Sequence, residues 1–320
     1  MILCCYNSAN RIRETLFHLS KQELDHNVSW EVILVDNNSN DSTLAAANDI
    51  WDSFRVDVPF KIISENKQGL AHARRRGIEE SNYDYLLFCD DDNWLDKNYL
   101  QLGYLILENN RVVGLVGGQS EAVLESETPE WFEGKKWCYV VGEQAGESGP
   151  LNNRTYLWGA GLVVRKSVLF VAAKFGFANY LIDRDGENLS SGGDSELCKW
   201  AILLGYQLWY DQRLKFKHFV PKNRISMDYV NGLYDGFKIA AYWLSKYDYI
   251  IFLKHQRRSK LINFVIGITK LIIRTDLNRS HLQFMIGPIC QISPDDDYYF
   301  IKTYYRFIYK SYVGQADHDG

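Results

Sequence analysis

The sequence predicts an α/β protein with a mostly parallel sheet and a helical region at its C-terminal end. Three observations support this prediction. Continuous apolar runs recur along the first third of the chain, as is typical of parallel strands buried on both faces. Segments with the apolar spacing of helices separate these runs. Polar residues follow several runs directly, at the strand ends where parallel sheets bind their ligands.

Strands and helices are expected to alternate along this part of the chain. The expected strands are Ile2–Tyr6, Glu31–Asp36, Phe60–Ser64, Tyr85–Cys89 and Arg111–Val116. The expected helices are Ala9–Gln22, Thr43–Phe54, Leu70–Glu80 and Lys97–Asn109. Apolar residues recur at helical spacing in the first helix, and Asp41 or Ser42 is a suitable N-cap for the second.

The later part of the chain is less regular. Gln119–Tyr156 is rich in Gly, Glu and Trp and shows no period, so it is expected to be a long functional or mobile loop. A helix and two strands are expected next, at Asp194–Leu204, Tyr206–Tyr210 and Leu214–Phe219. The pattern turns helical from Met227 onward. The sequence therefore predicts an α/β domain at residues 1–225 and a helical region at residues 226–320.

Composition excludes several classes of protein. The formal net charge of −4 gives no basic excess to neutralise a nucleic-acid backbone, so no nucleic-acid partner is expected. None of the six cysteines forms a C-x-x-C pair, and the first residues do not resemble a secretory signal. No apolar run reaches the ~20 residues needed to cross a bilayer. These features favour a cytoplasmic protein.

Asp90, Asp91 and Asp92 directly follow the fourth expected strand. Three adjacent carboxylates repel one another, so they must be solvated or have a cation among them. Oxygen ligands of this kind suit Mg²⁺ or Mn²⁺, and either ion would in turn bind a diphosphate. A solvated turn before a helix explains the same residues equally well, because Asp and Asn favour turns and N-caps.

Two other aspartates lie at the ends of expected elements. Asp36 ends the second strand, where it can accept hydrogen bonds from a base or a ribose, or can serve as a turn residue. Asp194 follows two glycines at a helix start, where a carboxylate stays ionised as a general base requires. The alternative for Asp194 is an ordinary N-cap. No G-x-G-x-x-G sequence follows the first strand, which counts against a dehydrogenase.

Basic residues accompany these aspartates. Gly69 opens a helix that carries Arg74, Arg75 and Arg76, which can face the aspartates or a phosphate. A solvated basic face accounts for at least one or two of the three arginines. His218 lies on the last expected strand, and a single histidine in such a place is more often packed or solvated than a ligand.

Seven segments of the chain resemble a known family in their order and spacing. They are CYNSA, EVILVDNNSNDST, ENKQGLAHARRRG, YLLFCDDDNWLD, WGAGLVVRKS, LSSGGDSELCKW and LGYQLWYDQRLKFKHFVP, and they cover about Ile2–Pro221. This set resembles the family 2 glycosyltransferases with the GT-A fold, of the bacterial cell-surface polysaccharide type. The resemblance implies a nucleotide-sugar donor, with UDP expected from its frequency in the family. It also implies Mn²⁺ or Mg²⁺, inversion at the anomeric carbon, and a hydroxyl of a glycan or lipid-linked acceptor.

The resemblance assigns roles to individual residues. Donor contacts fall on Cys5, Tyr6, Asn7, Asp36, Asn38, Asn66, Arg74, Asp90 and Asp91. The metal ligands are Asp92, Asp90 and His218, and the catalytic base is Asp194 with Glu196 as the fallback. Acceptor contacts fall on Trp158, Gly159 and Glu196. The chain departs from the family at Cys4, where Pro is common, at Arg75, where Asn is common, and at Gly193, where a Glu commonly precedes the base.

Two other functions explain parts of the same sequence. A phosphatase with an aspartate nucleophile would need an Asp-x-Asp after the first strand, closely followed by Thr. Here the aspartates follow the fourth strand and no such Thr is present. A catalytically inactive nucleotide-sugar binder or membrane scaffold is the second alternative, and the retention of Asp92 and Asp194 counts against it.

The C-terminal region contains a basic segment. Between Lys254 and Arg279, seven Lys or Arg residues stand against one acid, Asp276, which gives this segment a net charge of +6. Within it, Leu261–Ile273 has an apolar face at helical spacing. Such a pattern is typical of a helix that lies on the surface of an anionic membrane, and here that surface would be the inner face of the cell membrane. A helix packed on the catalytic domain with a solvated basic rim explains the pattern equally well.

Overall fold

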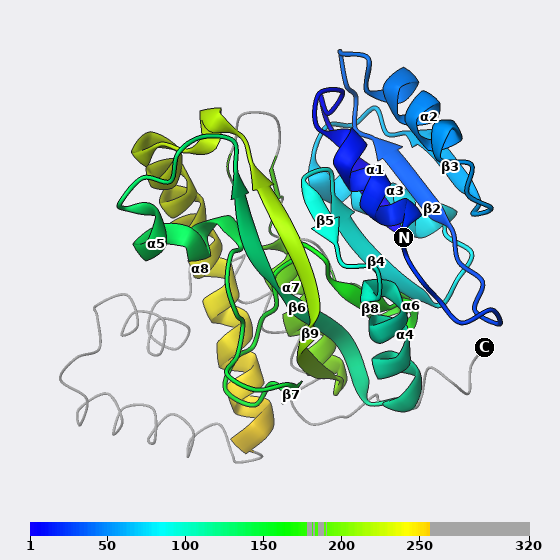
Figure 1. The fold of residues 1–320 in the computed structure, drawn as a ribbon. Coiled ribbons are helices and arrows are strands. Elements are labelled where there is room, and N and C mark those ends of the chain that lie inside the picture. The colour runs from blue at the N-terminus through cyan, green and yellow to red at the C-terminus, as the bar shows by residue number, and fades with distance from the viewer. Residues whose placement is uncertain (178–180, 182, 185–188, 190, 257–320) are drawn as a thin grey trace.

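The structure is a computed structural model that describes residues 1–177, 181, 183, 184, 189 and 191–256 (Figure 1). Its strands are β1 (Ile2–Cys5), β2 (Val32–Asp36), β3 (Phe60–Ser64), β4 (Tyr85–Asp90), β5 (Asn93–Leu95), β6 (Val113–Leu124), β7 (Gly149–Pro150), β8 (Val163–Arg165) and β9 (Gln207–Val220). Its helices are α1 (Ile12–Ser20), α2 (Thr43–Phe54), α3 (Leu70–Glu80), α4 (Tyr99–Asn109), α5 (Phe132–Lys135), α6 (Lys166–Lys174), α7 (Gly193–Leu204) and α8 (Met227–Gln256). The 3-10 helices η1 (Lys136–Tyr139) and η2 (Lys222–Arg224) complete the description.

The strands form one sheet in the order β3-β2-β1-β4-β8-β6-β9-β5, and β7 pairs with β9. β3, β2, β1 and β4 run parallel, as the continuous apolar runs predict. The register sets Cys5 beside Asp36 and Cys4 beside Asp90. The polar ends of β1, β2 and β4 therefore meet at one edge of the sheet, and the expected α/β fold is confirmed.

The other half of the sheet contains antiparallel pairs. β8 lies antiparallel between β4 and β6, and the short β5 pairs antiparallel with β9. The β5–β9 register sets Asn93 opposite His218. Because Asn93 follows the three aspartates directly, this pairing brings a histidine that is distant in sequence to the end of β4.

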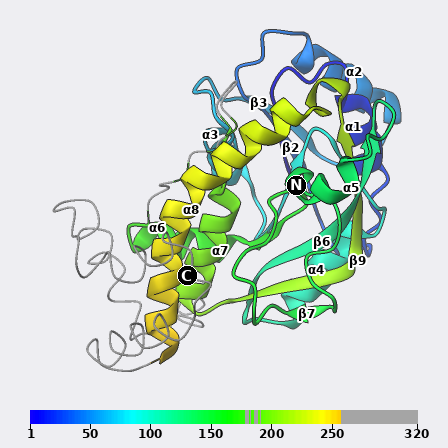
Figure 2. The ribbon, with the colours of Figure 1, turned by 90° about the vertical axis from the view of Figure 1, so that its left-hand side faces the viewer.

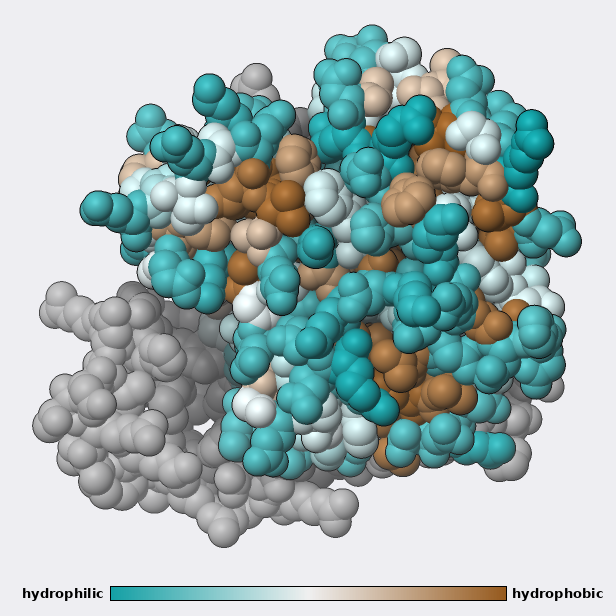
Figure 3. Space-filling view, in the orientation of Figure 1, coloured by the Kyte–Doolittle hydropathy of each residue, from teal (hydrophilic) through white to brown (hydrophobic). Residues whose placement is uncertain are grey.

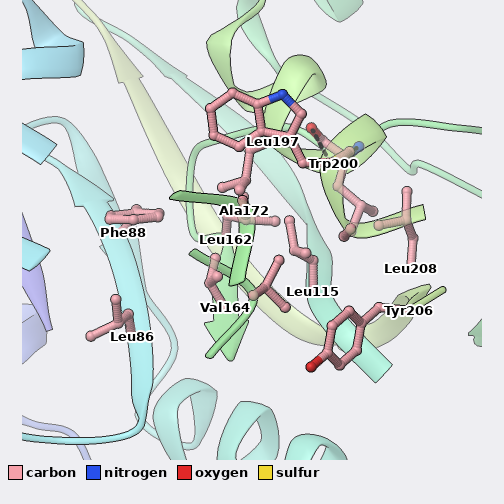
Figure 4. Close-up of a cluster of buried hydrophobic side chains, with 14 of the residues drawn as sticks. Leu86, Phe88, Leu115, Leu162, Val164, Ala172, Leu197, Trp200, Tyr206 and Leu208 are labelled. Carbon is pink, nitrogen blue, oxygen red and sulfur yellow. Dashed lines mark hydrogen bonds between the residues drawn. The ribbon is translucent and has the colours of Figure 1, made fainter. Parts of the chain in front are cut away.

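Helices cover both faces of the sheet, because successive residues of a buried strand point to opposite sides. Ile33 belongs to a core that the sheet shares with α3, α6, α7 and α8. Its neighbour Leu34 belongs to a second core, shared with α1, α2 and α4. Figure 4 shows the first core, in which Leu115 and Val164 of the sheet lie below Leu197 of α7.

The long helix α8 runs diagonally across the molecule in Figure 2 and packs on α7. Tyr247 and Ile250 of α8 are fully buried in the first core. Near the start of the helix, Val230 and Leu233 pack against Tyr139 of η1 in a third apolar cluster. The face of the molecule in Figure 3 is mainly hydrophilic. None of the helices in the described part combines the length and hydropathy that a bilayer crossing requires.

Several elements differ from the expectation. The expected long loop after Gln119 contains the last part of β6 together with α5, η1 and β7. The two strands expected after α7 are one long strand, β9, which pairs with β6 through a shift in register. β5, β8 and α6 were not expected from the sequence. The apolar segment Leu261–Ile273 and most of the basic segment around it lie outside the described residues, and the division of the chain at residue 225 stays a prediction.

Candidate active site

A cavity of about 510 Å³ lies at the carboxyl ends of β1 and β4. Further walls come from the start of α3, the Trp158–Gly159 turn, the start of α7 and one side of α8. Ten of the residues assigned by resemblance line it: Cys5, Tyr6, Arg74, Asp90, Asp91, Asp92, Trp158, Gly159, Asp194 and His218. The fold therefore brings together residues from six parts of the sequence at the edge of the sheet where a ligand is expected.

Each of the three adjacent aspartates faces its own arginine. The ion pairs are Asp90 with Arg74, Asp91 with Arg11 and Asp92 with Arg224. The three arginines come from α3, from the residue before α1 and from η2. An arginine thus lies beside each carboxylate, although Asp90 shares Arg74 with Asp183, and these arginines relieve part of the repulsion without a metal ion. The sequence analysis expected either solvent or a cation among these aspartates, and it did not foresee the arginines.

Asp92 is the most buried of the three. Its side chain is 5% exposed, with Oδ1 at 3.4 Å from His218 Nε2 and Oδ2 at 3.0 Å from Arg224 Nη1. Burial raises the pKa of Asp92, but His218 and Arg224 outweigh burial and hold that pKa well below its usual range. Asp92 is therefore a carboxylate over the whole physiological pH range.

Asp92 and His218 fit a divalent cation that arrives with a phosphate. Among the described residues, no group of three or more His, Cys, Asp or Glu side chains is placed to hold a metal ion. Ions such as Mg²⁺ are bound through one or two carboxylates plus substrate phosphates, so they need no such cage. A carboxylate oxygen and an imidazole nitrogen together suit Mn²⁺, and Asp90, two residues before Asp92, is the most exposed of the three carboxylates at 31%.

Arg74 crosses the cavity between two carboxylates. Its side chain is 13% exposed, with Nη1 at 3.3 Å from Asp183 Oδ2 and Nη2 at 3.9 Å from Asp90 Oδ1. The guanidinium also lies 5.3 Å from the ring centre of Phe88. Arg75 and Arg76 instead form ion pairs with acids of their own helix, which confirms that part of the basic run is a solvated face.

Asp194 stands in the first turn of α7 and faces the cavity. Its Oδ2 accepts a hydrogen bond of 2.7 Å from the backbone N–H of Gly159, and its Oδ1 accepts one of 2.6 Å from Ser195 N–H. These two bonds fix the direction of the carboxylate. The remaining lone pairs are open to a proton from a bound hydroxyl, which is the geometry a general base requires.

Asp36 and its neighbour Asn37 have different surroundings. Asp36 is 4% exposed, and among the described residues its Oδ1 has no hydrogen-bond partner, although Oδ2 accepts from Ser39 N–H at 3.3 Å. An unpaired buried acceptor of this kind is costly unless a ligand donates to it. Asn37 lines the cavity and ties the β3–α3 connection in place by accepting from Gly69 N–H and donating to two carbonyls.

Some assigned residues do not line the cavity. Asn38 and Asn66 are exposed, and the amide of Asn7 accepts from the backbone of Asn40 in the adjoining loop. Glu196 is buried in the core, where it accepts from Leu181 N–H at 3.1 Å and from Tyr247 O–H at 2.7 Å. This placement gives Glu196 a role in joining α7 to α8 and gives it no route to an acceptor sugar.

Several polar cavity residues were not identified from the sequence, among them Arg11, Asn37, Asp183 and Arg224. Asn37 could have been found, because it lies within the polar run after β2. The two arginines and Asp183 carry no local signal, since their importance comes from partners far away in the sequence. Arg224, for example, lies 132 residues from Asp92.

Comparison with known proteins identifies the family. The family model described as glycosyl transferase family 2 matches residues 1–169. The glycosyltransferase AglE of Haloferax volcanii is 28% identical over 213 residues, which cover 66% of this chain and 63% of that relative. Poly-beta-1,6-N-acetyl-D-glucosamine synthase of Staphylococcus aureus is 29% identical over 108 residues, which cover 34% of this chain and 24% of that relative. The chain thus spans less than two thirds of these relatives.

A solved structure shares the fold. The crystal structure of Staphylococcus aureus TarS residues 1–349 in complex with UDP-GlcNAc superposes with a TM-score of 0.54 at 17% identity, covering 89% of this chain and 70% of that one. The fold is therefore that of the GT-A glycosyltransferases. The family match covers just over half of the chain, and the protein belongs to glycosyl transferase family 2.

Proposed function

We propose that the protein is an inverting glycosyltransferase that moves a sugar from a UDP-sugar to a hydroxyl of a glycan or lipid-linked acceptor in surface polysaccharide synthesis. One observation carries the proposal. A single cavity is lined by a carboxylate–histidine pair, Asp92 and His218, by a buried arginine, Arg74, and by an oriented carboxylate, Asp194. Glycosyl transfer to a hydroxyl needs these groups, because a diphosphate leaves while a proton is removed from the acceptor.

The donor is proposed to lie between the ends of β1 and β2 and the aspartates after β4. Cys5 and Tyr6 line the cavity, whereas Asp36, which pairs with Cys5 in the sheet, does not line it. The buried, unpaired Oδ1 of Asp36 would accept from a base or ribose only once the end of β2 opens to the donor. The diphosphate then lies near Arg74, and the two carboxylate partners of this arginine hold the guanidinium in place. The UDP-GlcNAc complex of TarS supports a uridine nucleotide, since that protein has the same fold.

In the proposed reaction, the acceptor hydroxyl attacks the anomeric carbon from the side opposite the diphosphate. A bond forms between the hydroxyl oxygen and this carbon, and the bond from the carbon to the phosphate oxygen breaks. The Asp194 carboxylate takes the hydroxyl proton. Arg74 stabilises the negative charge that grows on the departing diphosphate.

Asp92 and His218, with Asp90, are the residues that would hold Mn²⁺ or Mg²⁺. When bound, such an ion supplies electrostatic stabilisation of the diphosphate charge. Arg224 already pairs with Oδ2 of Asp92, so it would compete with a cation for this carboxylate.

A thermal-shift panel of nucleoside diphosphates and nucleotide sugars, each with and without Mn²⁺, tests the proposal. Ligands that bind the folded state raise the melting temperature in proportion to affinity, and the largest rise is expected for uridine nucleotides with Mn²⁺. Release of UDP from UDP-sugars is then measured for the donors that bind. If no nucleotide raises the melting temperature, the proposed function is wrong. A rise without any release of UDP would favour the inactive binder.

Contact with an anionic membrane at the inner face of the cell is a separate proposal. It rests on the net charge of +6 between Lys254 and Arg279 in a chain whose total is −4. Co-sedimentation with anionic and neutral vesicles over a salt series is the test. We expect binding to anionic vesicles that weakens with salt and is lost when residues 257–320 are deleted, a deletion that keeps α8 and its part of the core. No binding at low salt would refute the proposal.

A further inference from the structure

Asp183 is a buried carboxylate in the cavity wall to which neither the family resemblance nor the proposed mechanism assigns a task. It lies between α6 and α7, its side chain is 9% exposed, and it lines the same cavity as Arg74 and Asp194. Burial raises the pKa of Asp183, and the positive charge of Arg74 lowers this pKa in part. An acidic side chain that is this buried normally has specific partners.

The first partner of Asp183 is the arginine of the cavity. Asp183 Oδ2 lies 3.3 Å from Arg74 Nη1, while the other carboxylate near this guanidinium, Asp90, is more distant at 3.9 Å. Arg74 is therefore held mainly from the Asp183 side. Without that carboxylate, the guanidinium would be left with one long ion pair and the ring of Phe88.

The second partner of Asp183 is the first residue of α7. Asp183 Oδ1 accepts a hydrogen bond of 2.8 Å from Gly193 N–H, which is one of the backbone donors left unpaired at a helix start. A Cβ built on Gly193 would lie 2.5 Å from Asp183 Oδ2. Asp183 thus fills the space in which a side chain of residue 193 would stand, immediately before Asp194.

The side chains of Arg74 and Asp194 both lie against Gly159. A Cβ built there would lie 2.9 Å from Arg74 Nη2 and 3.1 Å from Asp194 Oδ2, so both side chains pass over the same glycine. Asp183 touches the arginine directly and the helix that carries Asp194 through its first N–H. Among the described residues of the cavity wall, Asp183 is the one that hydrogen-bonds both to Arg74 and to the first N–H of α7.

We propose that Asp183 is a positioning residue of the transfer reaction, which holds Arg74 against the leaving diphosphate and fixes the helix start that carries Asp194. This inference rests on the proposed function. The carboxylate acts through Arg74 and α7 and is not itself required to touch the substrate.

The main test compares Asp183→Asn with the wild type and with Asp211→Asn. The asparagine keeps an oxygen for Gly193 N–H but loses the charge that holds Arg74. Asp211 is a matched control, because it is 2% exposed, pairs with Arg213 at 2.8 Å and accepts a backbone N–H, yet does not line the cavity. UDP release from the best UDP-sugar of the panel gives kcat and KM, and UDP titration gives the dissociation constant.

We expect Asp183→Asn to lower kcat about 100-fold, as misplacement of a catalytic group does, with UDP affinity within about threefold of the wild type. Asp211→Asn should keep its kcat. Asp183→Asn with a kcat within about threefold of the wild type would overturn the inference, as would equal losses in both variants. Wild-type protein that turns over no donor would instead refute the proposed function, so the two failures are distinguishable.

A double-mutant cycle tests whether Asp183 acts through Arg74. If it does, Asp183→Asn should add less than about threefold to the kcat loss of Arg74→Ala, because the arginine to be held is already absent. Independent, multiplying losses would overturn the positioning role. If Asp183→Asn fails to fold, Asp183→Glu takes its place, since glutamate keeps the charge and both acceptor oxygens. In Asp183→Glu, kcat must fall while the affinity for UDP stays that of the wild type.

Discussion

Gly159→Ala is the substitution whose effect follows most directly from the geometry of the cavity. The new Cβ would lie 2.9 Å from Arg74 Nη2, 3.0 Å from Asp194 Cβ and 3.1 Å from Asp194 Oδ2. Ordinary contacts of a Cβ begin at about 3.4 Å, so one or both side chains must move by a few tenths of an ångström. The backbone at Gly159 lies outside the left-handed region, so crowding alone decides the outcome.

Gly159→Ala is expected to change two quantities, the melting temperature and kcat. Insertion of a methyl group into a packed site costs about 1–3 kcal/mol. At roughly 2–4 °C per kcal/mol for a chain of this size, the melting temperature should fall by about 2–12 °C. Displacement of a base or a charge-stabilising group by a fraction of an ångström should also lower kcat about 10- to 100-fold.

The assay combines thermal unfolding with UDP release from a UDP-sugar. Gly134→Ala is the control, because no atom lies within 4 Å of a Cβ built at that position in α5. The control should keep both the wild-type melting temperature and kcat. If Gly159→Ala shows wild-type values in both measurements, the described packing of Arg74 and Asp194 around Gly159 is not the one that supports turnover.

Three further predictions concern the same site and the core. Asp194→Asn should lower kcat by several orders of magnitude and leave UDP affinity intact, whereas Glu196→Gln should mainly lower the melting temperature. If Glu196→Gln is inactive and Asp194→Asn is active in a UDP-release assay, the base is Glu196. Arg224→Ala should tighten the binding of Mn²⁺ to the nucleotide-free enzyme about tenfold in a calorimetric titration, because it removes the guanidinium that lies 3.0 Å from Asp92. An unchanged affinity for Mn²⁺ would show that Arg224 does not compete with the ion. Burial raises the pKa of the Cys198 thiol from 9.0 to about 12, so the folded state binds more protons than the unfolded state between these values. The free energy of unfolding should therefore fall as pH rises above 9, less steeply in Cys198→Ala, when urea unfolding is followed from pH 8 to 11.

Local sequence signals were sufficient for the elements whose stability is decided locally. The expected helix at Thr43–Phe54 and the expected strand at Phe60–Ser64 agree with α2 and β3 residue for residue. Each has a clear apolar period, and polar residues mark its ends. The expected helix Leu70–Glu80 agrees with α3 in the same way, because Gly69 marks its start.

Elements that depend on distant partners could not be predicted in this way. β8 has only three residues, and it exists because β4 and β6 pair with it on either side. β5 is equally short and is stabilised by β9, more than one hundred residues later. Three-residue strands have no period to detect, so their sequence alone does not distinguish them from a loop.

The same distinction applies to the site. Strand-end position was enough to single out Asp90 and Asp92 as cavity residues, because a parallel sheet brings its strand ends together, and Asp194 was singled out by its place at a helix start. The side chains that pair with them were not found from the sequence. Arg224 and Asp183 follow no motif, and each acquires its partner only through the sheet order and the position of α7 and α8.

The charges of the cavity give a physical reason for the donor to bind together with a cation. Among the described residues that line it, four arginines face five aspartates, which is a formal charge of −1 with His218 neutral. These residues are Arg11, Arg74, Arg184, Arg224, Asp90, Asp91, Asp92, Asp183 and Asp194. A diphosphate adds at least two negative charges to a cavity in which each of Asp90, Asp91 and Asp92 is already paired with an arginine. Releasing an arginine to the diphosphate would leave its aspartate as an uncompensated, mostly buried charge, which is strongly unfavourable. A divalent cation held by Asp92 and His218 would supply the missing positive charge and would compete with Arg224 for Asp92, so we expect nucleotide and Mn²⁺ to bind cooperatively.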